Sequence, residues 1–377
     1  MNNNNKSNQF PYEKRQELPS LTGIRFLVAL LVFLFHASLG YIFNPFENKE
    51  INVLFSFLFS VAGWIGVSFF FILSGFVMVW SARATDTPFL FWGRRAFKIY
   101  PVHIITWSMA LAIGLANFNS VDIWITNFFL VHSWFSSMEF FVSVNPPSWS
   151  LCSEVFFYAL FPFILKPVLN IKPKYLLVVL STIFIGLISY QIVVDYFVPS
   201  TPTLPLWPLS ESQWWLSYNY PLGRLFEFII GMILARITIE NLWRNSSGMT
   251  AIIAAIVGYV IALYTPFQYS LNVITIIPIS VIVLVIASMD LINKNNFLKS
   301  RLMILLGEIS FAFYMSHYLV LVIVKKYFIN SGLSAIHSIM LISITLLISL
   351  FLAYFIYIFI ERPIMNLARR YFIKKVI

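Results

Sequence analysis

Arg25 and His36 are the residues whose type and spacing best fit a chemical role. Both lie in the first long apolar run, residues 21–42, where an unpaired cation or imidazole is costly. They are 11 residues apart, which at about 100° per residue brings both side chains to one helix face. A neutral imidazole accepts protons near pH 7, so His36 is a candidate general base. A snorkelling arginine and a hydrogen-bonded structural histidine are the alternatives.

The axial separation of these two groups indicates their depths. At a rise of about 1.5 Å per residue they lie about 16 Å apart along the helix, roughly half the hydrocarbon thickness of a bilayer. The spacing therefore predicts Arg25 near a membrane surface and His36 near mid-depth.

Arg95 and Lys98 extend the basic character of that surface. They are three residues apart just before another apolar run, so they share a helix face at its cytoplasmic end. With Arg25 at the same level they are candidates to bind the phosphates of a nucleotide-containing donor. Lipid headgroups are the alternative partners of these cations.

Glu154 is a carboxylate about 7 Å inside the outer end of a predicted helix that begins at Trp149. We expect it to orient His36 or to bind substrate hydroxyls, so it is a second candidate catalytic residue. The alternative is an ion pair with Arg224, although Arg224 can also pair with Glu227 three residues away. Cys152 is about 200° around the helix from Glu154 and is not expected to act with it.

Ser310, Tyr314 and His317 form a polar stripe in an otherwise apolar segment, because they are spaced by four and three residues. We assign them to substrate positioning, with hydrogen bonding between helices as the alternative. The pair Arg362-Pro363 is predicted to end the last helix. Phosphate-binding loops, dinucleotide fingerprints, HExxH and serine elbows do not occur, and Cys152 is the only cysteine. We therefore expect no metal ion and no tightly bound cofactor.

The elements that carry these residues are membrane helices. The 377 residues are 59% hydrophobic and 11% charged, with a mean hydropathy of +0.83, too apolar for a soluble globule. The apolar runs are continuous, without the alternation of a barrel strand, which predicts an all-α polytopic membrane protein. The net charge of +10 is scattered between these runs, so it does not indicate nucleic-acid binding.

About ten runs have nearly the length needed to cross a bilayer. They are residues 21–42, 63–81, 99–116, 149–165, 175–197, 223–237, 249–264, 271–289, 303–327 and 336–360. Two further stretches are ambiguous. Residues 51–62 extend the second helix or lie in the interface, and residues 123–135 are short and aromatic enough to be interfacial or re-entrant.

The distribution of Lys and Arg orients the predicted helices. Ten spans from a cytoplasmic N-terminus leave only Lys49, Arg224, Lys325 and Lys326 among the cations outside, so both termini are expected to be cytoplasmic. An eleventh span at 123–135 would put the later basic loops outside. We therefore expect a cytoplasmic tail (1–20), one transmembrane domain (21–361), a basic cytoplasmic tail (362–377) and no soluble domain.

Six motifs recur in a characteristic order along nearly the whole chain. They are residues 18–25 followed by His36, residues 66–76, residues 95–101, residues 149–151 with Glu154, residues 306–307 with Ser310, Tyr314 and His317, and Arg362-Pro363. This set resembles the acyltransferase-3 family of bacterial integral-membrane acyltransferases, which includes O-antigen and exopolysaccharide O-acetylases. One departure is Lys98, where the family commonly has arginine, so bidentate phosphate geometry is not expected there.

The resemblance implies an enzyme of the bacterial cytoplasmic (inner) membrane. Its implied partners are membrane lipids, a cytoplasmic acyl-CoA donor, usually acetyl-CoA, and the hydroxyl of a glycan or lipid-linked saccharide. In this hypothesis the CoA phosphates bind Arg25, Arg95 and Lys98, and His36 is the general base. The chief alternative is a transporter or flippase of a lipid-linked sugar or small molecule, and a polysaccharide-export partner without catalytic activity is another. Corresponding interrupted helices in two halves, typical of transporters, are not evident.

Overall fold

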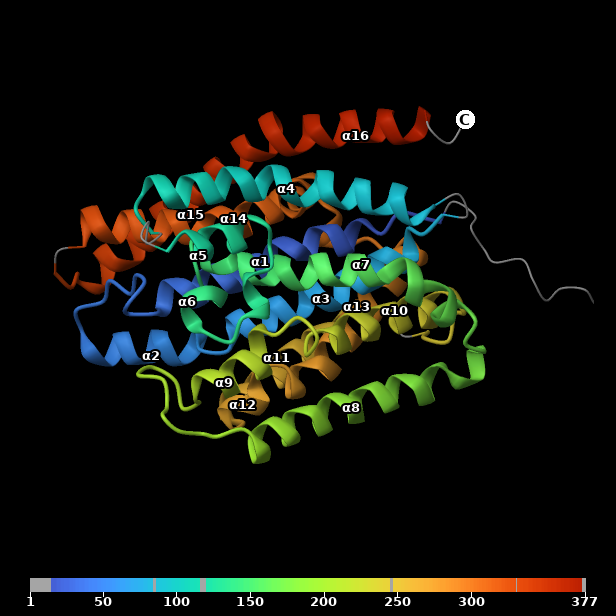
Figure 1. The fold of residues 1–377 in the computed structure, drawn as a ribbon, viewed down its shortest axis with the longest axis horizontal. Helices are drawn as coiled ribbons and strands as arrows, with labels where there is room; N and C mark the ends of the chain where they lie inside the picture. Colours follow the sequence, from blue (N-terminus) through green and yellow to red (C-terminus); the bar gives the residue numbers. More distant parts are fainter. Residues whose placement is uncertain (1–14, 84–85, 116–119, 245–246, 330, 375–377) are drawn as a thin grey trace, which may run out of the picture.

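The computed structural model describes residues 15–83, 86–115, 120–244, 247–329 and 331–374. Within these ranges the chain is helical and forms one elongated bundle, in which α8 and α16 lie on opposite edges (Figure 1). The described residues contain no β-strand beyond two isolated bridges. The predicted all-α class is therefore confirmed.

The long helices coincide with the predicted apolar runs. They are α1 (Pro19–Ser38), α3 (Ala62–Trp80), α4 (Pro88–Ala112), α7 (Trp149–Leu169), α8 (Leu176–Phe197), α10 (Leu225–Ile239), α11 (Gly248–Tyr264), α13 (Val273–Leu291), α14 (Arg301–Phe328) and α15 (Ala335–Ile356). Among the described residues, seven helical stretches are long and apolar enough to cross a bilayer. The chain is thus a polytopic membrane protein.

Short helices occupy the two ambiguous stretches and the connections around them. They are α2 (Lys49–Phe59), α5 (Val121–Phe128), α6 (Met138–Phe141), α9 (Glu211–Trp214) and α12 (Phe267–Ser270), and they lie towards the left end of the bundle in Figure 1. The eight residues of α5 are too few to cross a bilayer, which agrees with the rejection of an eleventh span at 123–135.

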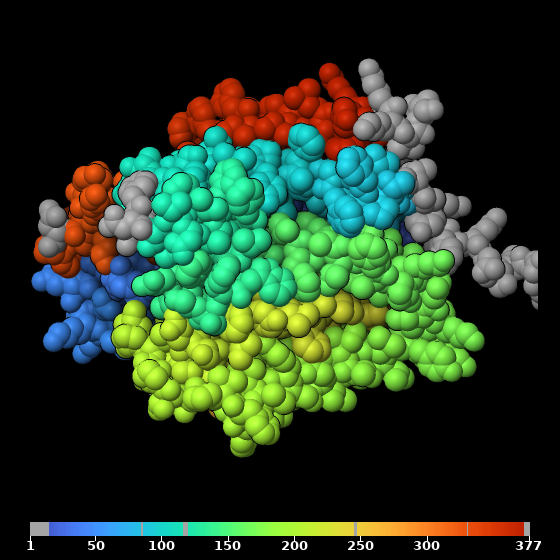
Figure 2. All heavy atoms as spheres, viewed as in Figure 1, coloured from blue at the N-terminus to red at the C-terminus, as the bar shows by residue number. Residues whose placement is uncertain are grey.

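The last helix does not end at Arg362-Pro363, so that prediction is wrong. A π-helical segment, Tyr357–Glu361, connects α15 directly to α16 (Arg362–Lys374). Pro363 is tolerated because it stands in the first turn of α16, where a missing N–H costs little. The predicted C-terminal tail is therefore helical up to Lys374, and Figure 2 shows α16 (red) lying along α4 (cyan).

Glycines bring two pairs of helices into backbone contact. A Cβ added at Gly307 of α14 would overlap the carbonyl oxygen of Thr22 in α1. Cβ atoms at Gly75 and Gly231 would likewise overlap the backbones of α10 and α3 respectively. Small residues at such crossings let helices approach closely in a membrane protein. Gly307 therefore sets α14, which carries His317, directly against α1, which carries His36.

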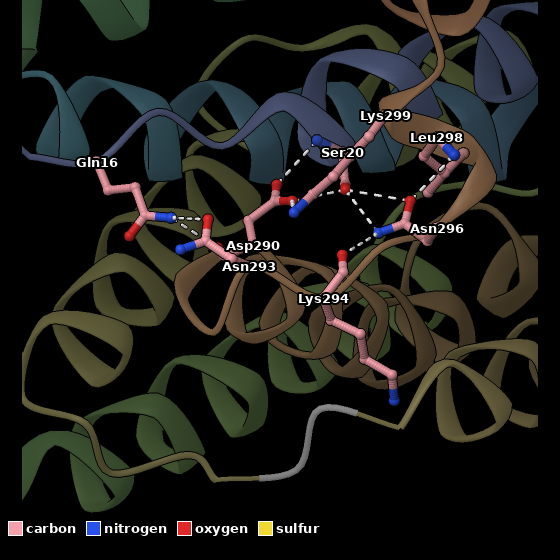
Figure 3. A network of polar contacts seen from close by, with 8 residues as sticks. All are labelled: Gln16, Ser20, Asp290, Asn293, Lys294, Asn296, Leu298 and Lys299. Atoms are coloured by element: carbon pink, nitrogen blue, oxygen red, sulfur yellow. Dashed lines mark hydrogen bonds and ion pairs between the residues drawn. The ribbon is translucent and has the colours of Figure 1, made fainter.

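The first turn of α1 is fixed by Asp290 at the end of α13 (Figure 3). The Asp290 carboxylate accepts hydrogen bonds from the Ser20 backbone N–H at 2.8 Å and from the Ser20 hydroxyl at 2.6 Å. Lys299 lies 3.2 Å from the same buried carboxylate. A carboxylate at a helix N-terminus satisfies unpaired N–H groups and complements the helix dipole. This network holds the start of α1, and with it the register of Arg25 and His36.

Candidate active site

A large cavity begins where α1 ends. We call this cavity, of about 520 Å³, the main cavity. Helices α1, α3, α7 and α14 form one side of it, and the loop before α9 covers another with Leu204, Pro205, Leu206 and Trp207. This is the size range of small-molecule binding sites in proteins.

His36 lies on the wall of the main cavity and contacts His317. The His36 Nδ1 and His317 Nε2 atoms are 2.9 Å apart, and His317 Nδ1 lies 3.1 Å from the Phe313 carbonyl oxygen. Because a carbonyl oxygen only accepts hydrogen bonds, His317 Nδ1 carries the ring proton. The unprotonated His317 Nε2 then accepts a hydrogen bond from the His36 Nδ1–H. His36 Nε2 then has a free lone pair. The network thus prepares one imidazole nitrogen to accept a proton.

His36 lies nearer the end of its helix than the length of the apolar run indicated. Helix α1 ends at Ser38, four residues before the end of the apolar run, so His36 lies in its last turn. The chain turns out of the helix there because the Leu39 N–H bonds the His36 carbonyl at 3.4 Å and the backbone becomes extended. His36 is therefore close to the end of the helix and to the surface loops.

A second, small cavity of about 60 Å³ lies further down α1, and Arg25, Glu154, Ser310 and Tyr314 are on its wall. These residues lie on three segments that are far apart in the sequence, and the fold brings them together. Val67 and Tyr314 belong to the walls of both cavities. The main and small cavities are thus neighbours, separated by these side chains.

Glu154 does not contact His36, contrary to one of its two expected roles. Its described hydrogen bond, at 3.2 Å, comes from the Tyr158 hydroxyl one turn later, and it interacts electrostatically with Arg25. The alternative pairing with Arg224 is also wrong, since Arg224 pairs with Glu227 at 2.9 Å and donates to Ser68 at 3.1 Å. The residue that orients His36 is His317.

Arg95 and Lys98, both on α4, lie near the Glu154 carboxylate. The Arg95 guanidinium lies over the rings of Phe91 and Tyr158, at 5.5 and 5.8 Å from their centroids. Lys98 forms an ion pair with the buried Glu361. Arg25, Arg95, Lys98, Glu154 and Glu361 interact electrostatically and are called the charge cluster below. The three predicted phosphate-binding cations are thus together, but Lys98 is already paired.

Two residues of the polar stripe of α14 line cavities, since Ser310 lies on the wall of the small cavity and Tyr314 on the walls of both. Ser310 donates to the Gly307 carbonyl at 2.7 Å, and Tyr314 shares a 2.9 Å hydrogen bond with Ser150. His317, which we expected to contact substrate, contacts His36. The spacing of Ser310, Tyr314 and His317 correctly predicted that they share one face of a helix. It did not predict which residue each of them contacts.

Several site residues were not singled out in the sequence. Tyr158 could have been found, because it is one turn from Glu154 on the same face. Glu361 could not have been found, because its partner Lys98 lies 263 residues away in the sequence. Trp64 and Asn219, which line the main cavity, have no local signal, because their role depends on helices and loops that meet only in the fold.

Cys152 and His132 form a buried pair apart from both cavities. The Cys152 Sγ and His132 Nδ1 atoms are 3.2 Å apart, and both residues are buried. Burial lowers the pKa of His132 to about 3, so it is neutral at physiological pH. Neither residue is on the wall of the main or small cavity. The pair is therefore structural.

Comparison with known proteins identifies the chemistry that this arrangement serves. The family model described as an acyltransferase domain matches residues 18–358. The chain belongs to this acyltransferase family. Membership decides against the transporter alternative, and the acyltransferase is an enzyme.

Several known proteins are similar to the acyltransferase over most of its length. It is 31% identical to acyltransferase MdmB of Streptomyces mycarofaciens, over 81% of this chain and 79% of the relative. It is 27% identical to exopolysaccharide production protein ExoZ of Rhizobium meliloti, over 72% and 81%. Peptidoglycan O-acetyltransferase OatA of Listeria monocytogenes is 24% identical, over 81% of this chain and 49% of the relative. No solved structure matches the chain.

Proposed function

We propose that the acyltransferase moves an acyl group, in the usual case acetyl, from acyl-CoA to a hydroxyl of a glycan or lipid-linked saccharide. The observation that carries this proposal is the position of His36, which contacts His317 and lies on the wall of a cavity large enough for a sugar unit. The names of ExoZ and OatA, an exopolysaccharide production protein and a peptidoglycan O-acetyltransferase, support a saccharide acceptor.

In the proposed reaction, His36 Nε2 removes the proton of the acceptor hydroxyl. The hydroxyl oxygen attacks the thioester carbonyl carbon, a C–O bond forms, and the C–S bond breaks with its electron pair leaving on sulfur. The CoA thiolate then takes the proton from His36, so an ester and free CoA result. His317 accepts the hydrogen bond from His36 Nδ1 throughout and stabilises the imidazolium.

We assign the donor phosphates to the charge cluster, with Arg25 and Arg95 as the principal contacts. Lys98 takes part only if a phosphate competes with Glu361 for its ammonium group. The small cavity has room for a few water molecules and not for a pantetheine arm. The proposal therefore requires Val67 and Tyr314 to move so that the thioester reaches His36.

We also propose the topology. Ten helices cross the inner membrane of a bacterium, and the end of the bundle that carries the start of α1 and the end of α16 faces the cytoplasm. Support comes from Arg15 at the end of α3 and from Phe372 of α16 beside Gly93 of α4, which place these segments at one end. Phosphate-binding cations near that end would meet cytoplasmic acyl-CoA.

Replacing His36 tests the proposed function. His36→Ala should lower acyl transfer at least about 100-fold, since general-base catalysis contributes that much or more. The measurement uses membranes that carry the protein and acetyl-CoA labelled in the acetyl group, and counts label in glycan.

A matched histidine provides the control for this experiment. His337 is exposed at the start of α15, so His337→Ala should transfer label at the wild-type rate. Wild-type transfer by His36→Ala, at equal amounts of folded protein, contradicts the assigned base.

A further inference from the structure

Tyr318, on α14, places a phenol beside His36. It lies on the wall of the main cavity, and its ring is perpendicular to that of His36, with the two centroids 5.3 Å apart. The Tyr318 side chain is only partly buried, and within the described residues its hydroxyl has no hydrogen-bond partner. This hydroxyl can therefore donate a hydrogen bond to a molecule bound next to the proposed base.

The position of Tyr318 on α14 indicates that its hydroxyl is on the cavity side of the helix. Phe311, Tyr314 and Tyr318 are spaced by three and four residues, so they follow one helix face. Phe311 lines the small cavity, Tyr314 lines both cavities and Tyr318 lines the main cavity. Tyr318 also interacts electrostatically with Tyr41, which comes from the loop after α1 and lines the same cavity.

The proposed reaction requires a donor of this kind. When the acceptor oxygen attacks the thioester, the carbonyl oxygen becomes an oxyanion, and enzymes stabilise that charge with hydrogen-bond donors or cations. The described residues on the wall of the main cavity include no Lys and no Arg. Tyr314 already donates to the Pro147 carbonyl at 3.2 Å, and Tyr41 is 53% exposed, so water competes for its hydroxyl. Tyr318 is the better placed phenol.

We propose that Tyr318 is a catalytic residue, whose hydroxyl donates a hydrogen bond to the thioester carbonyl oxygen while His36 deprotonates the acceptor. Tyr318 keeps its proton throughout. Its hydrogen bond strengthens as the C–O bond forms and the carbonyl oxygen gains charge, and it weakens again when the C–S bond breaks. This inference rests on the proposed function and deepens it, because it names the group that stabilises the oxyanion.

Removal of the hydroxyl alone tests this role. Tyr318→Phe keeps the ring that packs on His36, so we expect kcat to fall about 100-fold while the KM for acetyl-CoA stays the same. Tyr327→Phe is the matched control, because Tyr327 is on the same helix but is 65% exposed and does not line the main cavity. It should transfer acetyl at the wild-type rate.

A donor with sulfur in place of the carbonyl oxygen separates catalysis from a structural effect. Sulfur is a weak hydrogen-bond acceptor, so dithioacetyl-CoA gains little from the Tyr318 hydroxyl. The ratio of the wild-type rate to the Tyr318→Phe rate should fall from about 100 with acetyl-CoA to below about 10 with dithioacetyl-CoA. An equal ratio for the two donors, or wild-type transfer by Tyr318→Phe, overturns the inference. Either result leaves the His36→Ala experiment able to decide the proposed function.

Discussion

At the scale of single residues, the contact between His36 and His317 determines which nitrogen of His36 can accept a proton. The Phe313 carbonyl accepts a hydrogen bond from His317, which fixes the tautomers of both rings and leaves the His36 Nε2 lone pair free. In the proposed reaction these two hydrogen bonds hold the His36 ring in the orientation that it needs before the acceptor binds. His317 is thus a positioning residue.

Removing the His317 ring should lower kcat without a matching change in the KM for acyl-CoA. His317→Leu removes the acceptor for the His36 Nδ1–H, so we expect kcat to fall about 10- to 100-fold. His317→Gln keeps an acceptor oxygen and should restore part of the rate. The measurement is steady-state transfer from acetyl-CoA in purified protein. Equal rates for the Leu and Gln variants would exclude the positioning role.

The sequence was a good guide to which residues line the site. It was a poor guide to the contacts that each of them makes. Helical periodicity placed Arg25 and His36 on one face, and both line cavities in the structure. The same periodicity placed His317 correctly on its own helix. It could not show that Gly307 sets this helix against α1, because a contact between segments about 280 residues apart leaves no local pattern.

At the scale of helices, the crossing of α1 and α14 determines the active-site geometry. Gly307 lies ten residues before His317, and Thr22 lies fourteen before His36, so the closest backbone contact lies below the imidazole pair. A small change at the crossing therefore moves one imidazole relative to the other.

A side chain at Gly307 should impair activity and stability together. In Gly307→Val the Cβ would overlap the Thr22 carbonyl oxygen, so α14 must move away from α1. We expect a thermal unfolding midpoint several degrees lower and at least about tenfold slower transfer, since overpacking costs about 1–3 kcal/mol and separates the histidines. Thermal unfolding in detergent and the transfer assay measure these effects.

Gly40→Ala is the matched control for Gly307→Val. Gly40 has open space around its Cα, so this variant should keep the stability and rate of the wild type. A Gly307→Val protein as stable and active as Gly40→Ala would mean that the α1–α14 crossing tolerates separation.

At the scale of the whole molecule, the Asp290 network closes the bundle. It joins the first turn of α1 to the end of α13, which lies 270 residues further along the chain. Lys299, just before α14, completes the network. The continuous apolar runs predicted the ten long helices, because a segment that crosses lipid must satisfy its backbone hydrogen bonds internally. It missed the junction at Arg362-Pro363, because a π-helical segment has no pattern of its own.

Loss of the Asp290 charge should destabilise the folded protein. Asp290→Asn keeps the shape of the side chain but weakens its bonds to Ser20 and Lys299, so we expect a loss of about 1–3 kcal/mol. Thermal unfolding in detergent measures the change. Asp122→Asn, an exposed aspartate in the first turn of α5, is the control and should be neutral. Equal midpoints for the two variants would contradict the role of the network.

The side chains of Val67 and Tyr314, which stand between the main and small cavities, have a consequence for the energetics of the cell. In the proposed topology an open aqueous passage through the bundle would let protons leak and dissipate the proton-motive force. With this partition closed, the enzyme stays ion-tight while it is at rest. A partition that opens only during transfer would therefore preserve the membrane voltage.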